Sequence, residues 1–295
     1  MKITEILRTG KILLSDGAWG TFLYNKGLQP GDCPDEWTLS HPGDVEAIAA
    51  SYIAAGSDMV ETNSFGANRY KLEHYGLQNK VAEINRQAAQ LSRHAAGNDR
   101  FVLGSVGQTG KMLMMGDITE DDMYECYKEQ IVALEEGGAD AVCIETMTDA
   151  DEAAIAILAA KDNTDLEVIC TFTFDRTGEH EYHTMMGLTP TEAARRALEA
   201  GADIIGTNCG NGIEQMIDIV NDIKQSYHNA LILVHANAGL PELRDGKNFF
   251  PETPEMMASF VPKLIKAGAN IIGGCCGTTP EHIAAIGKAL CSVNF

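Results

Sequence analysis

Eight short apolar segments alternate along the chain with segments of helical period, and this alternation constrains the fold more than any other feature. The apolar segments are 11–20, 58–66, 101–110, 140–149, 167–175, 203–212, 231–239 and 270–278. Each runs into polar or glycine-rich residues. Their apolar residues are continuous rather than alternating, which indicates strands buried on both faces, as in a parallel sheet.

The segments between these apolar runs have the spacing of helices with one apolar face. Segment 44–56, for example, places Val45, Ile48 and Tyr52 on one side. Further helical segments are 123–138, 189–201, 213–227, 253–268 and 279–290. Several begin with Thr-Pro, which suits an N-cap before a first-turn proline, and several end in glycine, which suits a left-handed residue after a helix.

Eight strands alternating with helices predict an α/β fold, a single (β/α)8 TIM barrel over residues 1–295. The 295 residues suit such a barrel, which typically needs about 250. A doubly wound open sheet is the structural alternative. The repeated joints "EGGADAV", "EAGADII" and "KAGANII" favour the barrel, because each leads by the same short turn from a helix end into a strand.

Composition and charge exclude several classes of protein. No apolar run reaches the roughly 18 residues of a membrane span, and the N-terminus lacks the apolar region of a signal peptide. We therefore expect a soluble cytoplasmic protein with no membrane partner. A formal net charge of −20 argues against nucleic acid as a partner, because binding it needs clustered Lys and Arg.

The stretch "GGCCGT" (273–278) places two of the eight cysteines side by side. A strained disulfide, a buried apolar pair or a metal site could explain the pair, and cytoplasmic cysteines should be reduced. Cys209 ends the sixth apolar segment, and Cys275 and Cys276 end the eighth. Strand ends two apart around a barrel both face its mouth, so the three thiolates could hold zinc with one open position, as catalytic zinc sites do.

Adjacent residues of a regular strand point in opposite directions, so Cys275 and Cys276 can both bind a metal only if the strand ends before them. The flanking glycines permit such an irregular backbone. The alternative is that the cysteines are small buried residues that pack the barrel. We expect that simpler role for the other five cysteines, which are Cys33, Cys126, Cys143, Cys170 and Cys291.

Other polar residues also lie where the apolar segments end, which is where a barrel assembles its active site. They are Asp16, Glu61, Thr62, Asn63, Ser105, Glu145, Asn208 and Asn237. Carboxylates, amides and thiols on so many strand ends predict one assembled site. Simpler roles are open for individual members: Asp16 as a turn residue, Glu145 as a charge at a helix N-terminus and Asn237 as a turn amide. His235 is expected to be a core histidine.

Sequence motifs resemble those of the homocysteine S-methyltransferase family along nearly the whole chain. In order they are "DGAWGT", "ETNSFGAN", "SVGQTG", "ETMTD", "GTNCG", "NAG" and "GGCCGTTPEHI". The resemblance implies a (β/α)8 barrel with Zn2+ on Cys209, Cys275 and Cys276. It also implies Asn237 as a possible fourth ligand when substrate is absent.

The same resemblance implies an enzyme that binds homocysteine, activates its thiol as a zinc thiolate and methylates it to methionine. Asp16 and Glu145 match family acids that recognise the amino group of the substrate. Backbone N–H groups around Ser105 and Val106 could take its carboxylate. Glu61 and Thr62 lie on a matching motif and could support the site.

The chain looks most like the homocysteine-binding module of cobalamin-dependent methionine synthase, through "SVGQTGK", "GDITEDDMYECYKEQI" and "PEHI". It has no visible cobalamin-binding or folate-binding region, so methylcobalamin would arrive on a separate corrinoid protein. S-methylmethionine or S-adenosylmethionine is the second expectation for the methyl donor. Two further functions stay open, namely methylation of a different thiol and a non-catalytic zinc-dependent thiol-binding module.

Overall fold

The computed structural model describes residues 2–244 and 247–292, which form a (β/α)8 barrel. Its eight strands are β1 (Leu13–Leu14), β2 (Met59–Glu61), β3 (Phe101–Val106), β4 (Ala141–Met147), β5 (Glu167–Phe172), β8 (Ile204–Gly212), β9 (Ile232–Asn237) and β12 (Ile271–Gly274). All pair in parallel in the order β1-β12-β9-β8-β5-β4-β3-β2. Each lies within a predicted segment, and this sequential order confirms the barrel rather than the open sheet.

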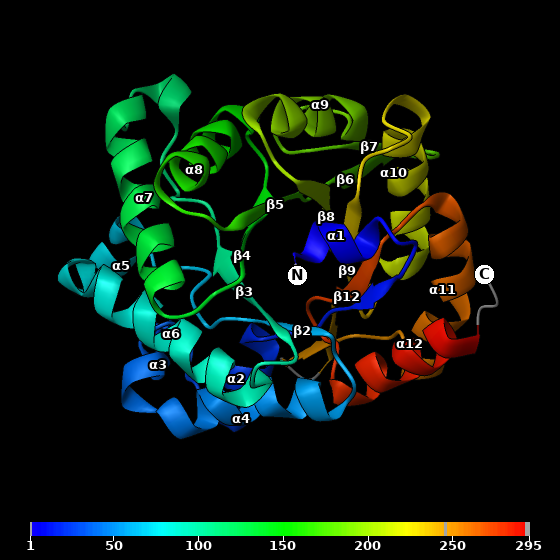
Figure 1. The fold of residues 1–295 in the computed structure, drawn as a ribbon, viewed down its shortest axis with the longest axis horizontal. Helices are drawn as coiled ribbons and strands as arrows, with labels where there is room; N and C mark the ends of the chain where they lie inside the picture. The colour runs from blue at the N-terminus through cyan, green and yellow to red at the C-terminus, as the bar shows by residue number, and fades with distance from the viewer. Residues whose placement is uncertain (1, 245–246, 293–295) are drawn as a thin grey trace.

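Helices surround the strands (Figure 1). They are α4 (Pro42–Ala54), α6 (Val81–Ala96), α7 (Glu120–Glu136), α8 (Ala150–Asn163), α9 (Pro190–Ala200), α10 (Ile213–Ser226), α11 (Pro254–Ala267) and α12 (Pro280–Ser292). The predicted caps form. Thr189 Oγ1 accepts the Glu192 N–H at 3.2 Å, and the Glu192 carboxylate accepts the Thr189 N–H. Within the described ranges, no helix has the length and apolar character needed to span a membrane.

The repeated joints place an Asp or Asn at the start of alternate strands, where its side chain ties two strands together. The N–H of Asp140 donates to the Val102 carbonyl at 2.8 Å, while the Asp140 carboxylate accepts the Val102 N–H at 2.7 Å. The same reciprocal pair recurs between Asp58 and Leu14, Asp203 and Val168, and Asn270 and Ile232. These pairs fix the register of the strands at their N-terminal ends.

The N-terminal end of the barrel is closed by α1 (Ile3–Leu7), which lies across it (Figure 1). Ile3 and Leu7 pack into the barrel interior, and the Glu167 carboxylate at the start of β5 accepts the N–H groups of Ile3 and Thr4. A functional site must therefore lie at the opposite, C-terminal end of the strands, as in barrel enzymes generally.

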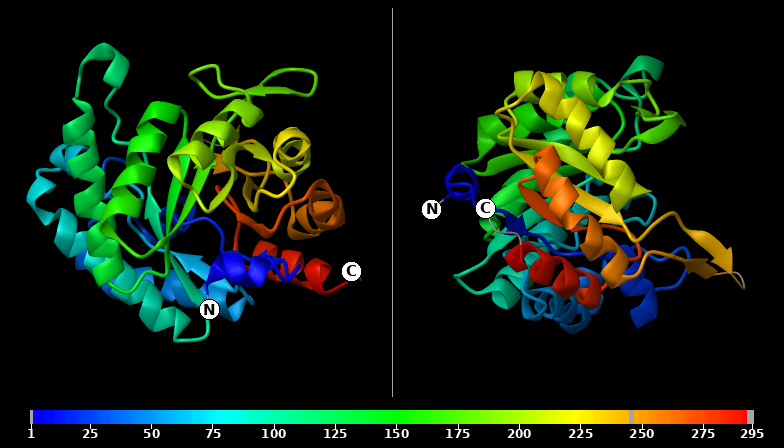
Figure 2. Two further views of the ribbon diagram at one scale, coloured as in Figure 1. Left: turned by 45° about the horizontal axis from the view of Figure 1, so that its top comes forward. Right: turned by 90° about the vertical axis from the view of Figure 1, so that its right-hand side faces the viewer.

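Connections at the C-terminal end carry the remaining elements. The connection after β1 contains α2 (Gly20–Lys26) and α3 (Trp37–Ser40), and the connection after β2 contains α5 (Arg69–Glu73). Two antiparallel hairpins follow β5 and β9, namely β6 (Asp175–Gly178) with β7 (Glu181–His183), and β10 (Glu242–Arg244) with β11 (Lys247–Phe249). Figure 2 shows the β10–β11 hairpin projecting from the end of the molecule opposite α1.

Candidate metal centre and active site

Three cysteines meet at the mouth of the barrel as the sequence predicts. The sulfur atoms of Cys209, Cys275 and Cys276 all lie within 4.8 Å of one another. Tetrahedral zinc with Zn–S bonds of about 2.3 Å holds its sulfurs about 3.8 Å apart, which is within this limit. All three side chains are partly exposed to the mouth, so the cluster is open to a ligand.

Local backbone geometry explains how adjacent cysteines share this cluster. Strand β12 ends at Gly274, so Cys275 and Cys276 lie beyond the regular strand, as expected. A Cβ on Gly274 would come within 2.4 Å of Thr278 Oγ1, so no larger residue fits there. Cys209 itself has a left-handed backbone (φ 56°) at a bulge in β8, an uncommon conformation that turns its side chain out of the strand.

The three thiols form hydrogen bonds with one another, which shift their pKa values. Hydrogen bonds from Cys275 and Cys276 lower the pKa of Cys209 to about 3. The same interaction with Cys209 raises the pKa of Cys276 to about 12 and that of Cys275 well above its ordinary value. Hydrogen bonds among the three thiols thus favour the thiolate form of Cys209.

Asn237 supplies a fourth donor atom beside the cluster. It ends β9, is 3% exposed, and its side chain interacts with Cys209. Its Oδ1 is fully buried and has no hydrogen-bond donor among the described residues. A buried oxygen without a partner is costly, and a cation among the sulfurs would satisfy it. Three thiolates and one amide oxygen are a donor set that fits zinc.

Carboxylates form a second group next to the sulfurs. Asp16, Glu61 and Glu145 are all buried, and burial is the main reason why their pKa values rise, to about 6 for Asp16 and about 7 for Glu145. The pKa of Glu61 rises well above its usual value because it also feels the charges of Glu145 and Asp16. Such a group favours a cationic ligand, because a nearby positive charge stabilises the ionised acids.

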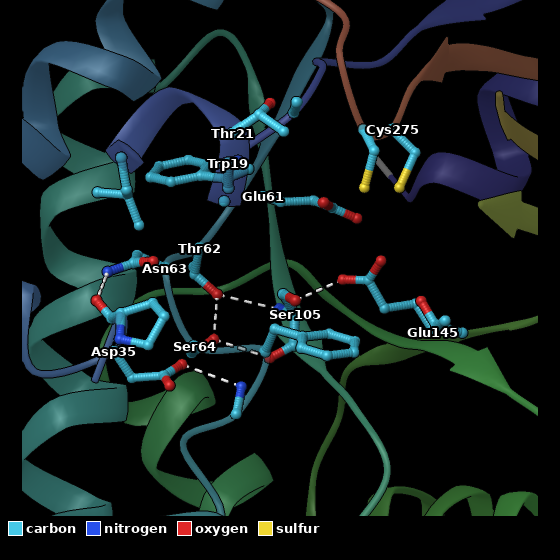
Figure 3. A pocket seen from close by; sticks show the side chains of 18 of the residues that line it. Trp19, Thr21, Asp35, Glu61, Thr62, Asn63, Ser64, Ser105, Glu145 and Cys275 are labelled. Atoms are coloured by element: carbon cyan, nitrogen blue, oxygen red, sulfur yellow. Dashed lines mark hydrogen bonds between the residues drawn. The ribbon is translucent and has the colours of Figure 1, made fainter. Parts of the chain in front are cut away.

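The individual acids are held differently. Glu145 lines the cavity, where Ser105 Oγ donates to its Oε1 (Figure 3). Asn208 Nδ2 donates to its Oε2 at 3.2 Å. Asp16 is fully buried and is not among the residues that line the cavity. Its Oδ2 accepts the Trp19 Nε1–H at 2.9 Å and the Glu61 N–H at 2.8 Å.

Hydroxyl groups around Ser105 form a connected network. The Ser105 N–H donates to Thr62 Oγ1 at 2.9 Å, Thr62 Oγ1 pairs with Ser64 Oγ at 2.6 Å, and Ser64 Oγ donates to the Ser105 carbonyl at 2.8 Å. Ser105 and Thr62 line the cavity, whereas Val106 is a fully buried core residue. The Ser105 N–H expected for the substrate carboxylate is therefore already paired, and its hydroxyl faces Glu145.

His235 is buried, as expected for a core histidine, but it also lines the cavity. Its Nδ1 lies 3.6 Å from Glu61 Oε1, and its Nε2 has no partner among the described residues. Burial lowers the pKa of His235 to about 4. The pKa of Glu61 is raised, chiefly by burial, so the environment disfavours the charged form of both side chains.

One cavity of about 480 Å³ joins these groups and opens at the C-terminal end of the barrel. The three cysteines, Glu61 and Glu145 lie on its wall, and Figure 3 shows Cys275, Glu61 and Glu145 turned toward the same space. Its other side is aromatic and apolar, with Trp19, Phe65 and Tyr75. The volume suits a small molecule next to the sulfurs.

The remaining cysteines mostly follow the simpler expectation. Cys33, Cys126, Cys143 and Cys170 are buried. Cys291 is exposed, so its expected burial is wrong. It lies in the last turn of α12, where its side chain points to solvent rather than to the barrel.

Sequence reasoning missed the role of two residues at the β4 and β8 ends. Thr146 has a left-handed backbone (φ 58°), and Asn208 makes hydrogen bonds both to it and to Glu145. The sequence indicates only that Asn208 is polar and lies at a strand end. Nothing in the spacing shows which neighbouring strand its amide contacts, because that depends on the closure of the barrel.

Fold and site together define a (β/α)8 barrel with a three-cysteine site that can hold a metal ion. The family model of homocysteine S-methyltransferase matches residues 13–290. The chain therefore belongs to the homocysteine S-methyltransferase family.

Relatives by sequence include methionine synthases. That of Mycobacterium leprae is 30% identical over 312 residues, which cover 99% of this chain and 25% of that protein. That of Mycobacterium tuberculosis is 29% identical over 303 residues, covering 96% of this chain and 25% of that protein. The chain thus spans about a quarter of the length of these relatives.

Among solved structures, the metallated form of the homocysteine methyltransferase MmuM from Escherichia coli has the same fold. Its TM-score is 0.77 at 22% identity, and the match covers 96% of this chain and 97% of that one. This similarity supports the fold, and the site must be argued from the residues of this chain.

Proposed function

We propose that the chain is a zinc-dependent methyltransferase that converts homocysteine to methionine. The observation that carries the proposal is the juxtaposition, in one cavity, of three cysteine sulfurs within 4.8 Å of one another and the buried carboxylate of Glu145. A thiol amino acid carries a sulfur at one end and an ammonium group at the other. The two halves of the site match these two ends.

Cys209, Cys275 and Cys276, with Asn237 in the absence of substrate, would hold the zinc. When bound, zinc would lower the pKa of the substrate thiol that coordinates it, so that the substrate sulfur is a thiolate at neutral pH. Glu145, with Glu61 beside it on the cavity wall and Asp16 buried behind the wall, would bind the substrate ammonium. Positioning of the sulfur in line with the methyl group should provide much of the rate.

The exposed apolar side chains at the C-terminal end of the barrel bear on the methyl donor. Ten of the twelve large exposed apolar side chains of the described residues lie in connections that follow the C-terminal ends of strands. They are Tyr24, Phe65, Tyr75, Met112, Met114, Met115, Met185, Leu240, Leu243 and Phe249. We call these ten residues the apolar rim. Their concentration at one end of the barrel favours that end as an interaction surface.

The apolar rim favours a donor that a protein presents to the mouth. S-methylmethionine and S-adenosylmethionine are small cations that could enter the cavity alone and have no need of an apolar surface outside it. A corrinoid is far larger than homocysteine and would have to meet the substrate at the opening. We therefore propose methylcobalamin on a corrinoid carrier as the donor. We also propose the reducing cytoplasm as the location, since none of the eight cysteines forms a disulfide.

X-ray absorption at the zinc edge, with and without homocysteine, tests the thiol half of the proposal. We expect three sulfurs and one lighter ligand alone, and four sulfurs with homocysteine. Freshly purified, reduced protein that contains no zinc and takes none up would overturn the proposal.

A methionine assay with methylcobalamin, S-methylmethionine and S-adenosylmethionine tests the donor. Turnover with methylcobalamin, and faster turnover when a corrinoid protein carries it, is the expected result. Preferential turnover with a sulfonium donor would replace the corrinoid assignment. Homocysteine binding without methionine from any donor would identify a thiol-binding module instead.

A further inference from the structure

The two halves of the site are linked by one side chain, that of Asn208. It directly precedes Cys209 in β8 and is 0% exposed. Its Nδ2 donates to Glu145 Oε2 at 3.2 Å and to Thr146 Oγ1 at 2.7 Å. Its Oδ1 accepts the Thr146 N–H at 2.8 Å and the Thr171 Oγ1–H at 2.7 Å.

Both hydrogens and both lone pairs of the Asn208 amide therefore take part in hydrogen bonds. These bonds connect β8 to β4 and β5. The satisfied network fixes the orientation of the amide. A flip would place the amino group against the Thr146 N–H and the amide oxygen against the Glu145 carboxylate. An aspartate would have the same shape but would set a second carboxylate oxygen against Glu145.

Thr146 follows Glu145 and has the left-handed backbone of φ 58°. For a β-branched residue this conformation is an outlier that its surroundings must enforce. Asn208 contacts both the N–H and the hydroxyl of Thr146, so it holds this turn at the end of β4. The turn and the direct bond from Nδ2 together determine where the Glu145 carboxylate lies.

We propose that Asn208 is a positioning residue, which sets the Glu145 carboxylate at a fixed place relative to the sulfur of Cys209. The distance between the Glu145 carboxylate and the cysteine cluster is thereby set to suit the distance between the ammonium and the sulfur of the substrate. This inference rests on the proposed function, because it assigns those two groups to the two ends of homocysteine. It adds a residue that touches neither the metal nor the substrate.

The test compares Asn208→Asp with Thr171→Val in the zinc-loaded protein. Asn208→Asp keeps the size and the acceptor for the Thr146 N–H but replaces the donor to Glu145. We expect the KM for homocysteine to rise about tenfold to a hundredfold, as for loss of a supporting bond to a binding group, with kcat and zinc content nearly unchanged. Thr171→Val removes a bond to the same amide but leaves its contact with Glu145, so KM should stay within about threefold of wild type.

A double variant separates a loss of stability from a loss of Glu145 positioning. Asn208→Ala with Thr146→Gly relieves the left-handed strain, since glycine adopts that conformation freely. It should restore the melting temperature lost in Asn208→Ala but not the KM for homocysteine. Recovery of KM in the double variant would overturn direct positioning of Glu145, as would an unchanged KM in Asn208→Asp.

Homocysteine binding, followed by X-ray absorption of the zinc, separates this inference from the proposed function. If the wild-type protein shows no fourth sulfur with homocysteine, the proposed function fails. If wild type and Asn208→Asp acquire the fourth sulfur at the same homocysteine concentration, only the role of Asn208 fails.

Discussion

The carboxylate of Asp16 accepts the backbone N–H of Glu61 at 2.8 Å, and this bond joins the ends of β1 and β2. These two strands lie at opposite ends of the strand order and share no ladder within the described residues. At the other end of the same seam, Asp58 pairs with Leu14. Asp16 thus closes the barrel beside the active site and places its negative charge under the acids of the cavity.

Substitution of Asp16 should separate its structural role from its charge. Asp16→Ala leaves the Glu61 N–H and the Trp19 Nε1–H buried without an acceptor and should destabilise the fold by about 1–3 kcal/mol. Asp16→Asn keeps an acceptor oxygen. Because burial raises the pKa of Asp16 to about 6, the folded state disfavours its ionised form at pH 7, and Asn should match or exceed the wild-type melting temperature.

Both variants of Asp16 should raise the KM for homocysteine, because each removes a negative charge near the ammonium site. Thermal unfolding and steady-state kinetics on the same samples provide the measurement. An Asp16→Ala protein with wild-type melting temperature would contradict the role of Asp16 at the seam. An Asp16→Asn protein with wild-type KM would restrict Asp16 to that structural role.

Replacement of a single cysteine of the cluster should remove the metal but not the fold. Cys209→Ala, Cys275→Ala and Cys276→Ala should each lower zinc from about one per chain to a small fraction and abolish methionine formation. The barrel core does not depend on these partly exposed side chains, so circular dichroism should be unchanged. Cys291→Ala, at an exposed thiol on α12, is the matched control and should keep both zinc and activity.

Homocysteine binding should weaken as the pH falls below about 7. Burial is the largest cause that raises the pKa of Glu145 to about 7, partly offset by the hydrogen bond from Ser105. In the proposed site the ionised form binds the ammonium, so protonation of Glu145 at lower pH should compete with the substrate, by up to about tenfold in KM per pH unit. Glu145→Gln should have a high KM that lacks this part of the pH dependence.

Zinc content at each pH is the control for this profile, since acid also releases metal from thiolates. KM should be compared only where the zinc content is constant. A wild-type profile as flat as that of Glu145→Gln between pH 6 and 8 would remove Glu145 from ammonium binding.

The apolar rim should matter only for a donor carried by a protein. Leu243→Asp and Met114→Asp add charge to side chains that are 77% and 71% exposed, so the fold should tolerate both. They should lower kcat/KM for a carrier-bound donor about tenfold, and leave turnover with free methylcobalamin unchanged. Leu158→Asp adds the same charge to an exposed apolar residue on α8, outside the apolar rim. Equal effects of all three variants would argue against docking on the rim.

The cysteine cluster and the barrel could be predicted from the sequence because both depend on local signals. Continuous apolar runs mark strands buried on both faces, and a repeated Gly-Ala-Asp or Gly-Ala-Asn joint marks the starts of three of them. Once the barrel is assumed, Cys209, Cys275 and Cys276 are expected at its mouth, and the family resemblance favours a metal site over simple packing. The prediction that β12 ends before Cys275 follows from its glycines and is confirmed.

The sequence by itself determined the eight strands, their order and the three thiols, because period, caps and turns act over a few residues. Only the tertiary structure decided that Asp16 bonds to β2, that the Ser105 N–H is paired and that Asn208 contacts Glu145. Each of these joins residues more than 40 positions apart. Which lone pair meets which N–H depends on barrel closure and on the left-handed turns at Thr146 and Cys209, and neither appears in any local pattern.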